Sequence, residues 1–351
     1  MWLNFCNNMT AQFHIDADIR KAQTLSSAFY TDPQFFELSK EKIFARTWQL
    51  ICPAQELKTS VYPINILEGF LDEPVFISRD TRGELNCLSN VCTHRGKILV
   101  DEPCEANLIR CGYHGRRFAL DGKFLSMPEF EQAENFPSES DDLPKIPFET
   151  WAKFLFAAIS PFAPLSDLIG DMSSRLNWQY LDELKLTAQK TYALSAHWAL
   201  YCENYLEGFH IPFVHDALNK QLDYGNYRTE LFRYSTLQTG YGKDGSIAAQ
   251  YFFVFPNMMF NFYPWGLSLN IVKPVWPDLT NVEYYTFVAD ESKLETGAGA
   301  GLETVEFEDQ AVVESVQRGL RSRLYDRGRY SPTREQGCYH FHLLIAEMMS
   351  S

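Results

Sequence analysis

Residues 92–114 read CTHRGKILVDEPCEANLIRCGYH and contain two cysteine–histidine pairs. The first pair is Cys92-x-His94, a spacer of 16 residues follows, and the second pair is Cys111-x₂-His114. A Cys₂His₂ zinc site usually takes its cysteines from one segment and its histidines from another, so this alternation argues against zinc. It suits a [2Fe–2S] cluster in which two thiolates hold one iron and two imidazoles hold the other. We therefore predict that these four residues bind such a cluster.

Glycines around the two pairs favour tight turns in which backbone N–H groups can donate to the cluster sulfurs. With Tyr113 before the last histidine and Gly115 after it, the segment resembles a Rieske domain. That family often has Pro in place of Gly112 and Trp in place of Arg116. The four ligands are unaffected by these departures, but we expect the packing around the cluster to differ.

A second group of potential ligands occurs at residues 203–215, which read ENYLEGFHIPFVH. If residues 198–211 form a helix, Glu207 and His210 share a face because they are three residues apart. On an unbroken helix His215 would point away, but Pro212 is expected to disrupt the helix and bring His215 back. Two imidazoles and a carboxylate form the facial triad of non-haem Fe(II) sites, with open positions for O₂.

The carboxylate is expected from a long amphipathic helix over residues 305–325. Its apolar stripe is predicted to comprise Val313, Val316, Leu320 and Leu324. Asp309 falls on this stripe, whereas Glu308 and Glu314 point away from it. An acid on the buried side of a helix is costly unless it is paired or binds a metal. We therefore predict Asp309 as the third ligand, with an ordinary carboxylate at a helix start as the alternative.

The pattern Glu207-x₂-His210-x₄-His215, followed by Asp309, resembles the catalytic motif of Rieske ring-hydroxylating oxygenase α subunits over nearly the whole chain. The resemblance implies an α+β protein with a small antiparallel β Rieske domain and a helix-grip (START-like) catalytic domain of antiparallel sheet and helices. It also implies a homotrimer in which residue 207 bridges His210 to His114 of the neighbour and carries electrons between subunits. Most of the family has Asp at this position; Glu207 is similar to the branch acting on quaternary ammonium compounds such as choline, carnitine or betaines.

By the same resemblance the chain is an enzyme, the oxygenase component of a two-component system. It would use O₂ and electrons from NAD(P)H, delivered by a separate flavin or iron–sulfur reductase, to hydroxylate or oxidatively dealkylate a small organic substrate. The one glycine-rich tract, GAGAG at 297–301, follows polar residues rather than a strand, so we expect a flexible loop and no dinucleotide site. Asn204, one helical turn before Glu207, is either a hydrogen-bonding residue of the site or an ordinary helix residue.

Three domains are predicted: an N-terminal helical segment at 1–48 that packs on the catalytic domain, the Rieske domain at 49–160, and the catalytic domain at 161–351. Residues 32–48 read as a helix capped by Asp32, with Pro33 in its first turn. Short β-branched runs separated by turn residues follow, and Pro161 and Pro164 mark their end.

The bulk properties limit the possible partners and the compartment. A net charge of −14 and a pI of about 5.1 argue against a nucleic acid or an anionic membrane surface. No run of 18 apolar residues occurs, and Met1–Asn8 lacks the pattern of a signal peptide. Eight cysteines are too few for a disulfide scaffold of this length, which favours a reducing compartment. We expect a cytoplasmic protein.

Three other interpretations stay open: an aromatic ring-hydroxylating dioxygenase, a non-catalytic Rieske electron carrier with a ligand-binding module, and a binding module with structural zinc. The substrate pocket is the least defined feature. Its candidates are Phe253, Phe255, Met259, Phe260, Phe262, Tyr263 and Trp265. Aromatic faces attract trimethylammonium groups, but the same residues would pack a hydrophobic sheet, and we expect most of them to do so.

Overall fold

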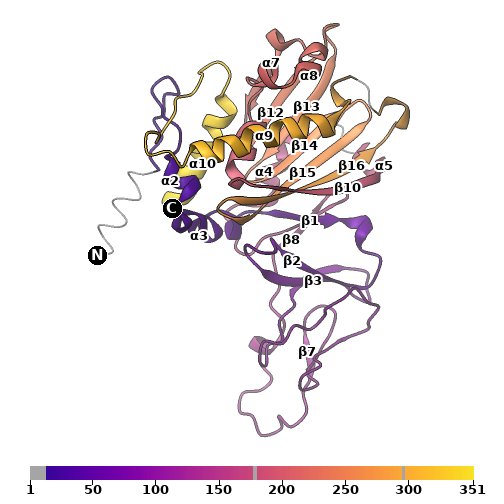
Figure 1. Ribbon diagram of the computed structural model, residues 1–351. Coiled ribbons are helices and arrows are strands. Elements are labelled where there is room, and N and C mark those ends of the chain that lie inside the picture. The colour runs from indigo at the N-terminus through magenta and orange to yellow at the C-terminus, as the bar shows by residue number, and fades with distance from the viewer. Residues whose placement is uncertain (1–12, 177–179, 295–296) are drawn as a thin grey trace. The chain divides into compact units, whose positions relative to one another are not determined.

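Figure 1 shows a computed structural model of the chain, in which residues 13–176, 180–294 and 297–351 are described. The chain forms two compact units: Ala45–Phe162, called here the β unit, and Met1–Phe44 with Ala163–Ser351, called the mixed unit. The prediction about a signal peptide concerns Met1–Asn8, which lies outside the described residues. Among the described helices, none is long and apolar enough to cross a membrane.

The β unit contains three small antiparallel sheets, ordered β1-β9-β8, β2-β3-β4 and β5-β6-β7. Their strands are β1 (Gln49–Pro53), β2 (Val61–Ile66), β3 (Glu73–Arg79), β4 (Leu85–Ser89), β5 (Ile109–Arg110), β6 (Arg117–Phe118), β7 (Phe124–Ser126), β8 (Phe148–Trp151) and β9 (Phe154–Ala157). Strands this short bury little surface each, and the sheets β2-β3-β4 and β5-β6-β7 share one core that includes Phe76, Phe118, Cys92 and Cys111. The predicted small antiparallel β domain is confirmed.

The mixed unit is built on one seven-stranded antiparallel sheet with the order β10-β16-β15-β14-β13-β12-β11. Its strands are β10 (Lys185–Leu194), β11 (Arg228–Leu231), β12 (Ser235–Tyr241), β13 (Ile247–Val254), β14 (Met258–Tyr263), β15 (Gly266–Trp276) and β16 (Leu279–Val288). The aromatic-rich residues predicted as strands form its centre, and α9 (Leu302–Gly319) lies across one face of the sheet (Figure 1). The α+β fold class is confirmed.

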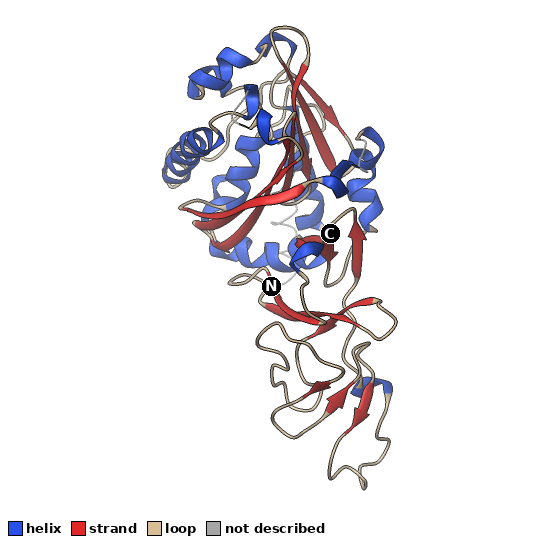
Figure 2. Cartoon of the chain, turned by 90° about the vertical axis from the view of Figure 1, so that its right-hand side faces the viewer, coloured by secondary structure: helices blue, strands red, loops and turns tan. Residues whose placement is uncertain are grey.

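In the described part of the chain all α-helices belong to the mixed unit, and the β unit has only short 3₁₀ turns; Figure 2 draws both kinds of helix in blue. Besides α9 they are α2 (Ser27–Thr31), α3 (Pro33–Lys42), α4 (Leu165–Arg175), α5 (Tyr180–Glu183), α6 (Trp198–Tyr205), α7 (Ile211–Val214), α8 (Asp216–Gln221) and α10 (Gln336–Ser350). The Asp32 side chain caps α3 by accepting from the Gln34 N–H, as predicted. The helix ends at Lys42, however, and a 3₁₀ turn at Phe44–Arg46 replaces the predicted continuation to residue 48.

The predicted helix over 198–211 is wrong in its second half. Helix α6 ends at Tyr205, and the next helix, α7, has Pro212 in its first turn. Proline is well tolerated there because the N–H that it lacks has no intrahelical partner. The break therefore lies before Pro212, in a turn where the Glu207 side chain accepts hydrogen bonds from the N–H groups of Phe209 and His210.

The apolar stripe predicted for α9 is also partly wrong. Val316 is 43% exposed, and Leu324 is 98% exposed because the helix ends at Gly319. The inward face instead follows Glu306, Asp309, Val313, Gln317 and Leu320. Three of these positions, Glu306, Asp309 and Gln317, are polar residues with partners from other parts of the chain, which obscured the true stripe. Within the GAGAG tract, Gly297–Gly299 form a 3₁₀ turn and Ala298 is buried.

Candidate active site

The two cysteine–histidine pairs lie in two loops with the same hydrogen-bond pattern. In each loop the cysteine N–H donates to the carbonyl five residues later, over 2.9 Å from Cys92 and 2.8 Å from Cys111. The glycine four residues after each cysteine donates back to the cysteine carbonyl, over 3.0 Å for Gly96 and 3.1 Å for Gly115. Both glycines have a φ above +70°, a conformation that other residues rarely adopt. The repeated turn is the reason for a glycine at each place.

The environment of these side chains matches the chemistry of a [2Fe–2S] cluster. Cys92 and Cys111 are buried thiols without a disulfide, whereas His114 is exposed and its ring lies 4.8 Å from that of His94, centroid to centroid. Burial alone would raise the pKa of the Cys111 thiol, but the N–H groups of Tyr113 and His114 and the neighbouring Cys92 thiol lower its pKa overall, while burial raises the pKa of Cys92. N–H groups that point at a sulfur favour the thiolate form that a cluster requires. The donor set therefore fits the cluster.

Arg116 occupies the position where the family often has Trp. Its side chain is only 3% exposed and forms an ion pair with Asp141, with Nη2 to Oδ1 at 2.5 Å. The guanidinium also faces three aromatic rings, those of Phe118, Phe124 and Phe136, at 5.0–5.7 Å from their centroids. A flat cation stacked on rings fills the space of an aromatic side chain, but it needs the carboxylate of Asp141 as its counter-charge.

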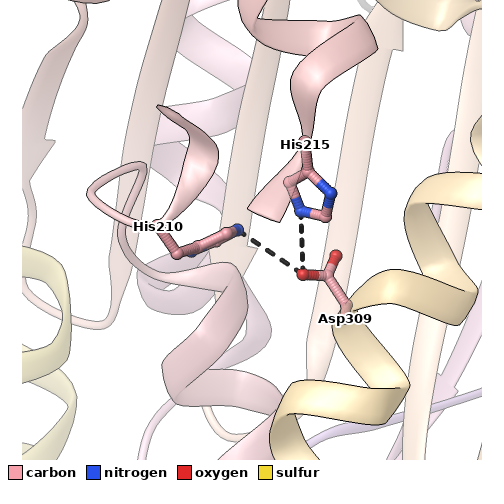
Figure 3. A group of neighbouring side chains, drawn as sticks. All are labelled: His210, His215 and Asp309. Atoms are coloured by element: carbon pink, nitrogen blue, oxygen red, sulfur yellow. Dashed lines mark hydrogen bonds and ion pairs between the residues drawn. The ribbon is translucent and has the colours of Figure 1, made fainter. Parts of the chain in front are cut away.

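In the mixed unit, His210, His215 and Asp309 converge on one point (Figure 3). One ligand atom from each lies within 4.8 Å of the others. Asp309 Oδ1 is 2.9 Å from His215 Nε2 and 3.5 Å from His210 Nε2. The two histidines come from the turn before α7 and from its end, while the acid comes from α9, some 90 residues further along the chain. Two imidazoles and one carboxylate suit a non-haem Fe(II) ion.

Each residue of this triad has a further polar partner. His210 Nδ1 lies 2.6 Å from Glu207 Oε1, and His215 Nδ1 lies 2.7 Å from Glu308 Oε2. The Asn204 amide donates to Asp309 Oδ1 over 2.7 Å. Glu308 was predicted to point away, which is wrong: its long side chain reaches back across the helix surface to the buried His215 ring. Carboxylates on the far nitrogen of metal-binding histidines orient the ring and increase its basicity.

A cavity of about 450 Å³ lies beside the triad, between the sheet and α6, α7 and α9. The pairing of the strands determines which side chains form one wall of the cavity, because residues directly opposite one another on neighbouring strands share a face. One row across five strands consists of Tyr251, Asn261, Ser268, Thr286 and Ala188, and the adjacent row of Asn270, Tyr284 and Lys190. Seven tyrosines and Trp265 are among the lining residues. Of the seven predicted pocket candidates, Tyr263 and Trp265 line the cavity and the others are buried in the core, as expected for most.

Sequence reasoning missed the acid at the centre of this lining. Glu306 accepts hydrogen bonds from the hydroxyls of Tyr201 and Tyr284, both at 2.5 Å. Burial, together with the nearby Asp309 carboxylate, raises its pKa to about 7. Its position three residues before Asp309 on the same helix was the available signal.

Comparison with known families identifies the two domains in which these residues lie. Residues 47–137 match the Rieske [2Fe-2S] domain, and residues 181–351 match the ring hydroxylating alpha subunit (catalytic domain). The chain thus belongs to the Rieske non-haem iron oxygenases, as an α subunit with a [2Fe–2S] domain and a non-haem iron catalytic domain. It is homologous to the oxygenase subunits of choline and carnitine monooxygenases, and it is an oxidoreductase of the Rieske monooxygenase family.

The relatives match along almost their full length. Choline monooxygenase of Arabidopsis thaliana is 28% identical over 97% of this chain and 86% of its own, and the carnitine monooxygenase oxygenase subunit of Escherichia coli K12 is 29% identical over 98% and 96%. The crystal structure of the quaternary ammonium monooxygenase CntA with L-carnitine superposes with a TM-score of 0.76 at 27% identity, covering 97% of both chains. Naphthalene 1,2-dioxygenase, at 18% identity and a TM-score of 0.71 over 94% of this chain and 92% of its own, shares the fold.

Proposed function

We propose that this chain is the oxygenase component of a two-component monooxygenase that hydroxylates or oxidatively dealkylates a small quaternary ammonium compound. The observation that carries the proposal is the cavity beside His210, His215 and Asp309, with its tyrosine-rich and acidic lining. Aromatic faces and carboxylates both attract an onium cation. An arene would take water from the carboxylates of the lining without bringing a positive charge to them, which is unfavourable.

We assign ligands in this chain to an iron–sulfur cluster and to a mononuclear iron. Cys92, His94, Cys111 and His114 would hold the [2Fe–2S] cluster, and His210, His215 and Asp309 would hold Fe(II). When bound, the cluster supplies single electrons and the mononuclear iron supplies the positions at which O₂ is activated.

The neighbouring side chains prepare the ligands for this role. A carboxylate can only accept a hydrogen bond, so Glu207 and Glu308 keep the proton of each histidine on Nδ1. The Nε2 lone pairs of His210 and His215 then face the metal. Asn204 donates to Oδ1 of Asp309 and holds that carboxylate in place. These residues orient the site and do not themselves react.

Electron supply is proposed to come from a separate flavin or iron–sulfur reductase that uses NAD(P)H. We further propose a homotrimer in which Glu207 of one copy meets His114 of the next. Aromatic rings are exposed close to both residues. In the β unit Tyr113 lies against His114 and is 58% exposed, and in the mixed unit Phe213, near His210, is 80% exposed. Exposed aromatic rings of this size favour burial in an interface. Inter-subunit electron transfer is also described for the quaternary ammonium monooxygenase of gut microbiota.

The first test is to purify the protein anaerobically and to measure iron, zinc, acid-labile sulfide and the visible spectrum. Two cluster irons with two sulfides, plus one further iron per chain, would support both sites. Zinc without sulfide would refute the assignment. Choline, L-carnitine and naphthalene are then incubated with the holoenzyme, O₂ and a surrogate reductase. Oxidation of an onium compound supports the proposal, whereas a diol formed only from naphthalene would overturn it.

A further inference from the structure

Glu306 is an acid of the cavity that the oxygenase chemistry described above does not use. It lies on α9 one turn before Asp309 and lines the cavity. Both tyrosine hydroxyls donate to the same oxygen, Oε2, and no described residue donates to Oε1. Hydroxyl groups satisfy hydrogen bonds but bring no positive charge. Burial raises the pKa of Glu306 to about 7, so the acid is only partly ionised near neutral pH, and a cation bound beside it would favour its charged form.

The charges on the cavity wall are unequal. Glu207, Glu303, Glu306 and Asp309 contribute four carboxylates, of which Asp309 belongs to the proposed iron site and Glu207 pairs with the histidine ligand His210. Apart from the histidines, Lys190 is the cationic side chain among the described lining residues, and it pairs with Glu303 at 2.8 Å. The Tyr192 hydroxyl donates to the same Glu303 oxygen over 2.9 Å. A substrate carboxylate would therefore find its cation already paired, whereas a substrate cation finds Glu306 without a counter-charge.

We propose that the substrate is a cation without a carboxylate, an onium alcohol rather than an onium acid, and that Glu306 is the residue that selects it. This inference rests on the proposed function and specifies its substrate class. Glu306 would face the onium group or accept from its hydroxyl, with the rings of Tyr201 and Tyr284 beside it. A zwitterion would instead bring its carboxylate into an acidic cavity, where like charges repel.

The experiment measures equilibrium dissociation constants by calorimetry on the iron-loaded holoenzyme, with choline, L-carnitine and γ-butyrobetaine as probes. We expect choline to bind at least about tenfold more tightly than either acid, because a charge-assisted contact is gained and a repulsion is avoided. Glu306→Gln keeps the shape and the two tyrosine hydrogen bonds but removes the charge. It should weaken choline binding about tenfold or more and leave the acids nearly unchanged.

Two further variants on α9 sharpen the result. Glu314→Gln removes an acid that accepts from the Ser195 N–H outside the cavity, and it should not change any of the three constants. Glu303→Gln releases Lys190 and should strengthen carnitine binding severalfold. Iron content is measured for every variant, because a loss of iron from Glu306→Gln would assign that acid to the metal instead of the substrate and overturn the inference.

The outcomes separate this inference from the proposed function. Carnitine or γ-butyrobetaine binding as tightly as choline to the unmodified protein, a result independent of any variant, would overturn the inference alone. So would an unchanged choline constant in Glu306→Gln with iron retained. Failure of all three onium compounds to bind, with oxidation of an arene, would overturn both.

Discussion

Substituting Gly337 by alanine should damage the iron site from outside it. Gly337 is the second residue of α10 and packs against the carbonyl of Leu206, which directly precedes Glu207. A Cβ at position 337 would lie 2.2 Å from the Leu206 oxygen, whereas ordinary contact begins at 3.4 Å, so the two elements must separate by about 1.2 Å. Leu206 is fully buried and its N–H is bound to the Cys202 carbonyl, so the separation is resisted.

The expected loss of folding stability follows from this steric overlap. Overpacking typically costs about 1–3 kcal/mol, and the upper end applies because the opposing atom belongs to the backbone and not to a flexible side chain. We therefore expect Gly337→Ala to reduce the free energy of unfolding by about 3 kcal/mol. A displaced Glu207 should also lower the iron affinity of the triad by about 10–100-fold, the usual effect of disturbing a partner of a metal ligand.

The assay is denaturant unfolding followed by far-ultraviolet circular dichroism. Since the described α-helices all lie in the mixed unit, the helical signal reports on that unit. The matched control is Gly170→Ala in the middle of α4, where an added Cβ meets nothing within 4 Å. That variant should be more stable by about 0.5–1 kcal/mol. If Gly337→Ala unfolds like the unmodified protein, or if both variants lose equal stability, the reasoning is refuted.

Three other substitutions test separate parts of the chain. The amide oxygen of Glu207→Gln can still accept from His210 Nδ1, unlike a displaced Glu207, so total iron and the cluster spectrum should persist while product formation falls by about 10–100-fold; unchanged turnover would argue against its proposed role. Asp141→Asn leaves the buried Arg116 cation without a counter-charge, so the cluster absorption should be lost at lower urea, with a cost of about 3 kcal/mol; equal midpoints would contradict this. Burial lowers the pKa of His197 to about 3 from 6.5, so the unfolded chain takes up a proton first as the pH falls. The free energy of unfolding should then decrease by about 1.4 kcal/mol per pH unit below 6.5, and His197→Asn should remove that part of the slope; identical slopes would refute it.

The ion pair of Asp141 has its own pH dependence. Burial would raise the pKa of Asp141, but hydrogen bonds from Ser138 and Arg116 lower it below 3.8. Its contribution to stability is therefore fully present above pH 3.8 and is lost as the pH falls through the lower folded value. Acid titration of the cluster absorption, compared between Asp141→Asn and the unmodified protein, measures this difference, and parallel curves would speak against it.

The proposed metal ligands could be recognised in the sequence because most of them lie close together along the chain. Cys92 with His94, and Cys111 with His114, are each held in one short turn whose glycine is visible in the sequence. His210 could be predicted in the same way, because Glu207 and His215 lie in the same short segment. Spacing along a chain determines geometry only over such local distances, where the number of allowed turns is small.

The inward face of α9 was predicted only in part. Asp309 was placed correctly toward the interior, yet Glu306 and Gln317 face inward too and Val316 faces outward. Polarity alone could not reveal this, because each inward polar residue is stabilised by partners far away in the sequence, such as Tyr284 for Glu306. Hydrophobic periodicity predicts a buried face only when that face packs against a core, and here it borders a cavity.

The sequence by itself therefore determined the α+β fold and the candidate ligands: the cysteine–histidine pairs proposed for a [2Fe–2S] cluster, and the two histidines and one acid proposed for iron. Only the tertiary structure decided what surrounds that iron. The cavity wall depends on the register of β10, β13, β14, β15 and β16, and a shift of one residue would turn every side chain to the other face. Register is set by pairing between distant strands, so the substrate-facing residues emerge only when the sheet is assembled.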